Sequence, residues 1–169
     1  MGHDKRVVER ANVFQPANGF FSLAVSDVTS AAHRYEDGPM IQGSCHCGAV
    51  RWRFDGLPDE ATACNCTICR RYGALWAYGF ENEDIHISGD TRIYAWGDRD
   101  LGFHFCTDCG CIAAWWATEK GADGRRYGAV NLRLAEPDSV AAIPIRHHDG
   151  FDTRKDLPRH GRSVADMWF

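Results

Sequence analysis

Residues 43–54, GSCHCGAVRWRF, place a Cys-x-Cys pair directly before a segment of alternating apolar and charged residues. Val50, Trp52 and Phe54 fall on one side of an extended chain, and the charged residues between them fall on the other. This period of two predicts a half-buried β-strand that begins just after the two cysteines. We therefore expect a fold in which short strands carry cysteine motifs at their ends.

The same strand pattern recurs at regular spacing along the following residues. Turn signals such as SGD at 88–90 separate the segments, and helical periodicity is scarce, with short helices expected only at 7–14 and 164–169. In 127–134 the alternation places Val130 inside and Asn131 outside. The sequence therefore predicts a mainly β domain. The further expected strands are 84–89 (DIHISG), 91–97 (TRIYAWG), 101–106 (LGFHFC), 111–118 (CIAAWWAT) and 127–134 (YGAVNLRL).

The chain has 169 residues, 44% of them hydrophobic and 25% charged, and a net charge of −4. This length and composition predict one globular domain. Residues 1–39 contain no cysteine and little periodicity, so we expect an N-terminal extension there and the main domain over 40–169. No apolar run is long enough to span a membrane and no secretory signal is evident, so the expected location is cytoplasmic. The mild acidity argues against a nucleic-acid partner.

All eight cysteines lie between Cys45 and Cys111. Disulfide frameworks belong mainly to short secreted chains, and this chain has neither property. Clustered cysteines at close spacing in a reducing compartment are typical of metal ligands. We therefore interpret the clusters as metal sites.

Two of the three clusters complement each other. Cys45 and Cys47 form a Cys-x-Cys pair, and Cys106 and Cys109 form a Cys-x-x-Cys turn followed by Gly110, which tolerates the backbone angle that such a turn requires. Four thiolates make a closed, tetrahedral structural zinc site. The competing interpretation is a chance pair of cysteine-bearing hairpins.

The third cluster, CNCTIC, contains Cys64, Cys66 and Cys69 and has no fourth cysteine next to it. Three protein ligands leave one position open for water or substrate, as a catalytic zinc requires. The alternative is a second structural site completed by Cys111 or by a histidine. The spacing by itself favours neither.

The motifs GSCHCGAVRWRF, CNCTICRRYGA and FCTDCG, between about Met40 and about Leu134, resemble in order and spacing the glutathione-dependent formaldehyde-activating enzyme family, also called the CENP-V-type domain. The resemblance implies a small β-rich "tent" fold with two zinc ions. It implies that the four-cysteine set holds a structural zinc. It likewise implies that Cys64, Cys66 and Cys69 hold the second zinc, where glutathione or its adduct acts.

The expected function is therefore that of a zinc-dependent carbon–sulfur lyase acting on a glutathione–formaldehyde adduct. One alternative is a non-catalytic zinc-stabilised binding module. Another is the same chemistry with a different thiol, because residues 144–169 look unlike the tail of the best-known glutathione-using members. The extension over 1–39 and Cys111 also depart from the family pattern.

Several neighbouring residues carry expectations of their own. Arg70 and Arg71 follow Cys69 and could bind the carboxylates of a thiol substrate, or could be solvated charges beside the metal. His46 points away from the ligands on either side of it. His104 shares the face of Cys106 in a regular strand and could approach a metal.

Two further expectations concern the other half of the sequence. His147 and His148 lie in a turn-like RHHDG segment and are expected at the surface. Cys111 is expected to be a small buried strand residue and not a ligand.

Overall fold

The computed structural model describes residues 38–167 of the chain. The helix expected at 7–14 lies outside the described residues, as does nearly all of the extension expected over 1–39, so the domain boundary at residue 40 stays a prediction. Among the described residues, no helix has the length and apolar character that a membrane crossing requires.

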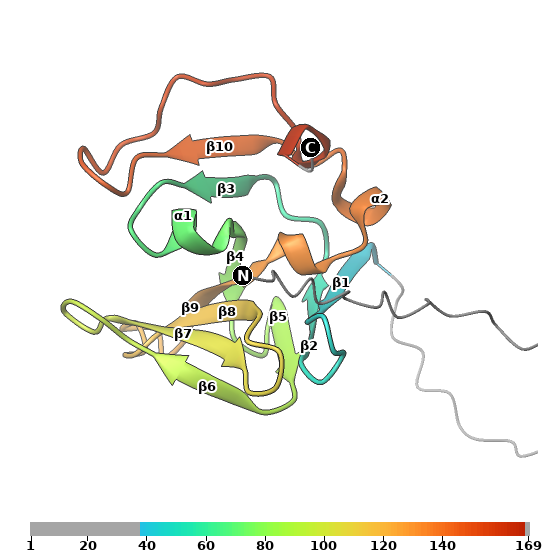
Figure 1. Ribbon diagram of the computed structural model, residues 1–169, viewed down its shortest axis with the longest axis vertical. Helices are drawn as coiled ribbons and strands as arrows, with labels where there is room; N and C mark the ends of the chain where they lie inside the picture. Colours follow the sequence, from blue (N-terminus) through green and yellow to red (C-terminus); the bar gives the residue numbers. More distant parts are fainter. Residues whose placement is uncertain (1–37, 168–169) are drawn as a thin grey trace, which may run out of the picture. The chain divides into compact units, whose positions relative to one another are not determined.

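Strands in this part of the chain form two sheets (Figure 1). The smaller sheet has the order β1–β2–β5, and the larger has the order β10–β3–β4–β9–β8–β7–β6. Every pair is antiparallel except β10 and β3, which run parallel. The strands are β1 (Met40–Ser44), β2 (Arg51–Asp55), β3 (Ala61–Cys64), β4 (Leu75–Phe80), β5 (Ile85–Ser88), β6 (Thr91–Tyr94), β7 (Leu101–Cys106), β8 (Ile112–Ala117), β9 (Tyr127–Asn131) and β10 (Ile145–His148).

Helices in the described residues are short, which confirms the prediction of a mainly β fold. They are α1 (Cys69–Tyr72), α2 (Pro137–Val140) and two 3₁₀ helices, η1 (Leu132–Leu134) and η2 (Val164–Met167). The helix expected at 164–169 corresponds to η2 over its described part. α1 ends at Gly73, whose φ of 60° is the left-handed conformation that commonly terminates a helix.

The larger sheet buries side chains on both of its faces. Leu75 and Ala77 of β4 pack with Trp52 and Phe54 of β2 in a core that lies between the two sheets. Trp76, which alternates with them, belongs to a second, aromatic core on the opposite face. The alternation predicted for β2 is thus confirmed, and the second core is the one on which the three-cysteine cluster rests.

The strand expected over 127–134 is shorter than predicted. β9 ends at Asn131, and the next three residues turn into η1. Asn131 is 2% exposed instead of facing solvent. Its side-chain oxygen accepts hydrogen bonds from the backbone N–H groups of Leu75 and Arg133, and its amide donates to the carbonyl of Ile112. A buried amide is stable only when its hydrogen bonds are made, and these three bonds satisfy the Asn131 side chain. Asn131 therefore faces inward, and the alternation predicted for 127–134 is broken there.

Four strands were not predicted, namely β1, β3, β4 and β10. β3 and β4 are nearly continuous apolar runs because both faces of the sheet are covered. β10 includes His147 and His148, so the expected surface turn begins only at Asp149. His147 is buried, which corrects the expectation that it lies at the surface. Its pKa is lowered by burial and by Arg159 and Arg162.

Candidate active site

Cys45, Cys47, Cys106 and Cys109 bring their four sulfur atoms within 4.8 Å of one another. Their two loops are tight turns: Gly48 donates its N–H to the carbonyl of Cys45, and Gly110, with a φ of 73°, donates to the carbonyl of Cys106. The left-handed Gly110 is the conformation that the sequence predicted for the position after the second cysteine.

The donor set of this group fits a tetrahedral metal ion. The Cys45–Cys47 and Cys47–Cys106 sulfur distances are 3.5 and 3.6 Å. Four sulfurs bound to zinc at about 2.3 Å would lie about 3.8 Å apart, which is close to these values. The N–H of Val50 points to the Cys45 sulfur at 3.2 Å, and such hydrogen bonds stabilise thiolates. All eight cysteines are free thiols, so no disulfide competes for these sulfurs.

The second group consists of Cys64, Cys66 and Cys69, whose sulfurs also lie within 4.8 Å of one another. Cys64 ends β3 and Cys69 begins α1, so a strand end and a helix start hold the group in place. The indole N–H of the buried Trp76 donates to the Cys69 sulfur at 3.1 Å. Histidines and carboxylates of the described residues contribute to neither group.

The three thiols cannot ionise independently at this separation. Contact with Cys64 and Cys69 lowers the pKa of Cys66 to about 2. Contact with Cys64 and Cys66, together with burial, raises the pKa of Cys69, and contact with Cys66 raises that of Cys64. A bound cation would favour ionisation of all three thiols together, because coordination favours the thiolate at each sulfur. The donor set therefore fits a metal ion with three protein ligands.

A cavity of about 430 Å³ opens onto the three-cysteine group. The four-cysteine group does not line this cavity, and Cys45, Cys106 and Cys109 pack with apolar residues such as Val50 and Ala113. The cavity is large enough for a small organic ligand. Its walls combine aromatic and charged side chains, and its lining includes Trp76, Tyr78, Trp96, Asp98, Arg99, Asp100, Phe103, Trp115, His148, Gly150, Phe151 and Arg154.

One wall of the cavity is the loop that follows β10, and Asn65 of the CNCTIC motif holds it. The Asn65 amide donates to Asp149 at 2.8 Å, and its oxygen accepts from the N–H of Phe151 at 3.0 Å. Asp149 also accepts two hydrogen bonds from Thr153. These bonds hold the pKa of Asp149 well below its usual range. The loop is therefore fixed directly onto the cysteine cluster.

His148 lies beside this cluster, which sequence reasoning missed. It pairs with Cys64 across the parallel β10–β3 ladder, and its Nδ1 is 2.9 Å from Asp156. A β-carbon built on Gly150 would lie 2.5 Å from the Cys64 sulfur and 3.6 Å from the His148 ring. The imidazole and the sulfur thus approach the same point in the cavity. The signal in the sequence that could have pointed to His148 was Asp156, a carboxylate eight residues further along.

The other sequence candidates lie elsewhere. His104 bonds Thr91 at 2.8 Å, and Thr91 pairs with Cys106 across the β6–β7 ladder, so His104 shares the face of Cys106 as predicted. It nevertheless joins neither cysteine group. Cys111 is half-buried, precedes β8 and joins neither cysteine group, and His46 joins neither group as well.

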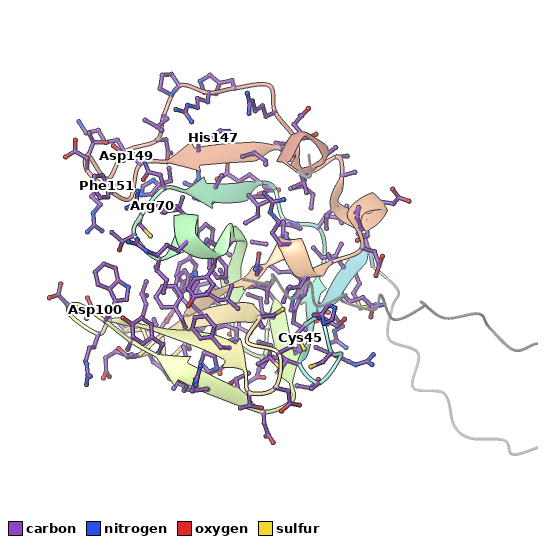
Figure 2. The ribbon with its side chains drawn as sticks, viewed as in Figure 1. Cys45, Arg70, Asp100, His147, Asp149 and Phe151 are labelled. Carbon is purple, nitrogen blue, oxygen red and sulfur yellow. The ribbon has the colours of Figure 1, made fainter. Side chains whose placement is uncertain are left out.

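The two arginines next to Cys69 do not line this cavity. The guanidinium carbon of Arg70 lies 5.3 Å from the centre of the Phe151 ring. Figure 2 shows the two residues close together. Arg71 lines a neighbouring groove. Their role in binding a thiol stays a prediction. The arginines that do line the cavity, Arg99 and Arg154, are far from any cysteine in sequence, so spacing gave no signal for them.

We expect Gly150→Ala to weaken metal binding by the three-cysteine group selectively. The new β-carbon would overlap the Cys64 sulfur and approach the Cys66 β-carbon to 3.1 Å. Relief of such overpacking costs about 1–3 kcal/mol, or roughly 10- to 100-fold in metal affinity. Competition with a chelator measures it, with Gly38→Ala, which meets no atom within 4 Å, as the control. Equal metal release from both variants would contradict the described placement of Gly150.

A family model and a curated relative point to the same family. The family model described as glutathione-dependent formaldehyde-activating enzyme matches residues 40–140. A Halomonas elongata protein, provisionally named as such an enzyme, is 31% identical over 85 residues, covering 41% of this chain and 52% of the relative. The chain thus spans about half the length of that relative. A Rhodobacter sphaeroides protein of known crystal structure is 26% identical, with a TM-score of 0.48, over 62% of this chain and 99% of the other. β10 and the loop after it lie beyond the matched residues.

Proposed function

Because the chain belongs to the glutathione-dependent formaldehyde-activating enzyme family, we propose that it joins a thiol to formaldehyde or splits the adduct, as a zinc-dependent carbon–sulfur lyase. Glutathione is the proposed thiol. The proposed metal is zinc, held by four cysteines at one site and by Cys64, Cys66 and Cys69 at the other. The observation that carries the proposal is the cavity of about 430 Å³ that is lined by all three cysteines of the second group.

The two cysteine groups have different tasks in this proposal. Cys45, Cys106 and Cys109 of the four-cysteine group pack in a small core, Cys47 is exposed, and the four sulfurs together offer the closed donor set of a structural site. The three-cysteine group has one ligand fewer and faces the cavity. A zinc ion held there would lower the pKa of an entering thiol, so that the thiol is deprotonated and nucleophilic at neutral pH.

The reaction needs one proton to be moved and one bond to be made. The sulfur of the thiolate attacks the carbonyl carbon of formaldehyde, the new carbon–sulfur bond forms, and the carbonyl electron pair moves to oxygen. That oxygen then takes up the proton that the thiol gave up. The lyase direction reverses these steps, so the thiol and the aldehyde are recovered without any oxidant or reductant.

His148 is the side chain placed to carry this proton. Asp156 accepts a hydrogen bond from its Nδ1, which leaves Nε2 as the atom that takes up and returns the proton. Trp76, Phe103 and Trp115 form an apolar part of the cavity wall. Apolar surroundings strengthen hydrogen bonds to the alkoxide oxygen that forms from the formaldehyde carbonyl.

Exchange spectroscopy tests this proposal. We expect the protein to accelerate the exchange between glutathione with ¹³C-formaldehyde and the hydroxymethyl adduct, measured by two-dimensional NMR at equilibrium. His148→Gln should slow the catalysed exchange by about 100-fold, the scale of general acid–base catalysis, while leaving the metal content unchanged. Cys111→Ser is the control, because Cys111 belongs to neither group.

Two results would count against the proposal. Exchange at the uncatalysed rate with metal in both sites would favour the non-catalytic module. Equal rates for His148→Gln and the unmodified protein would leave the lyase in place but remove His148 from the reaction.

A further inference from the structure

Two arginines from distant segments of the sequence line the cavity of the three-cysteine group. Arg99 lies on the loop between β6 and β7, and Arg154 lies on the loop after β10. β6 and β10 are the two edge strands of the larger sheet, so the loops approach the cavity from its two ends. Figure 2 shows this arrangement through Asp100 on one loop and Phe151 on the other, with Cys45 on the other side of the unit.

Both arginines have an unfavourable backbone conformation. Arg99 has a φ of 63° and Arg154 a φ of 58°, in the left-handed region that glycine and asparagine occupy more easily. Asn82 is the only other non-glycine residue with positive φ in the part of the chain that the structure describes. Strained residues gather at ligand sites, where the side chain compensates for the backbone. Two arginines in this conformation in one cavity therefore point to a task for their guanidinium groups.

The guanidinium groups of Arg99 and Arg154 make no ion pair or side-chain hydrogen bond with residues 38–167. By contrast, Arg146 of β10, the strand before the loop of Arg154, forms ion pairs with Glu60 at 2.8 Å and with Asp156 at 3.7 Å. An arginine without a partner offers five N–H donors in a planar arrangement that matches a carboxylate. The cavity thus holds two carboxylate-binding groups beside the thiol site.

The loop of Arg154 is held in place before any ligand enters. The backbone N–H of Arg154 donates to the carbonyl of Asp149 at 2.9 Å, and Asn65 ties Asp149 to the cysteine motif. The backbone N–H of Arg99 likewise donates to the carbonyl of Trp96 at 3.1 Å. These bonds set the points on the cavity wall from which the two side chains extend, and a backbone that is already fixed loses less freedom when a ligand binds.

We propose that Arg99 and Arg154 bind carboxylates of the thiol substrate, and that this pair selects peptide or amino-acid thiols over uncharged thiols. The inference rests on the proposed function, because it takes the three-cysteine group as the place where the thiol sulfur is held. Arg154 lies beyond residues 40–140, which the family model matches, so half of the proposed selecting pair lies outside the matched region.

Asp98 and Asp100 refine the substrate class. Both flank Arg99 and line the same cavity. Carboxylates there would repel a ligand that carries only negative charge and would attract an ammonium group. Trp96 and Phe151 supply apolar surface next to them. The cavity is thus suited to a thiol with an amino-acid end, on which a carboxylate and an ammonium group lie close together.

Calorimetric titration of the zinc-loaded protein tests the proposal with named ligands. Arg99→Asn and Arg154→Asn remove the charge while keeping a residue that tolerates the left-handed backbone. Each should weaken glutathione binding by about tenfold or more and leave 2-mercaptoethanol binding unchanged. Glutathione diethyl ester should bind the unmodified protein about as weakly as glutathione binds the variants. Thermal unfolding of both variants should be no lower than that of the unmodified protein.

Three comparisons decide the result. Arg53→Gln, which lies on β2 and lines neither cavity, should bind glutathione normally. Equal binding of glutathione and its diethyl ester, or a loss seen with Arg70→Gln and Arg71→Gln but not with the asparagine variants, would overturn the assignment. Separately, S-methylglutathione binding as tightly as glutathione would show that no free thiol is required, and that outcome would overturn the proposed function.

Discussion

Cys66→Ser should release one metal ion per chain and slow adduct exchange by about 1000-fold, while the domain stays folded. Cys66 lies between the other two ligands of its group and is only half-buried. Serine supplies a hydroxyl group, which is a far poorer zinc ligand than a thiolate. Loss of a catalytic metal removes several kcal/mol of transition-state stabilisation, which corresponds to this fall in rate. Metal analysis and NMR exchange measure the two effects on one sample.

The matched control is Cys111→Ser, which should keep two metal ions and full exchange because Cys111 joins neither group. Unfolding of Cys66→Ser would mean that the second metal holds the fold together. The three-cysteine group would then be a structural site, and the enzyme interpretation would lose its main support.

Cys106→Ser should have the opposite consequence, with loss of the fold itself. Cys106 is 1% exposed, ends β7 and shares a small core with Cys45 and Val50. Binding at a structural zinc site contributes about 10–16 kcal/mol in small zinc domains, whereas a typical domain is stable by only about 5–15 kcal/mol. We expect no cooperative thermal transition in this variant by circular dichroism, and poor recovery of soluble protein.

Chelation of the unmodified protein provides an independent check on the same site. Progressive chelation should remove the metal of the three-cysteine group first, without unfolding, and the second metal only together with the fold. A Cys106→Ser variant that melts cooperatively near the temperature of the unmodified protein would contradict a structural role for the four-cysteine group.

Local patterns predicted the parts of the fold whose information lies within a few residues. The alternation at 50–55 and the spacing of the cysteines each depend on neighbours in sequence, so the half-buried strand and the two cysteine groups were predictable. β3 and β4 were missed because a strand covered on both faces loses its alternation. Asn131 was misplaced because its burial depends on partners that the fold brings from β4 and β8.

The walls of the candidate site were harder to predict than its metal ligands. Arg99, Arg154 and His148 act together with Cys64 only because β10 folds back alongside β3 and the β6–β7 loop approaches from the other edge. No spacing rule joins residues that are 30 to 90 positions apart. Besides Asp156, a usable signal was compositional: Asp149-Gly150 after two histidines marks a turn that places polar groups at a strand end.

The parallel pairing of β10 with β3 has a consequence for protein engineering. Without β10, β3 would be an open edge next to Cys64, and unpaired strand edges promote self-association. Shortening the chain after residue 140 would therefore yield an aggregation-prone protein instead of a smaller enzyme. New thiol preferences are better sought by exchanging the loop at 151–155 while keeping Ile145–His148, Asp149, Gly150 and Asp156. The loop that we propose to select the ligand then remains anchored to β10.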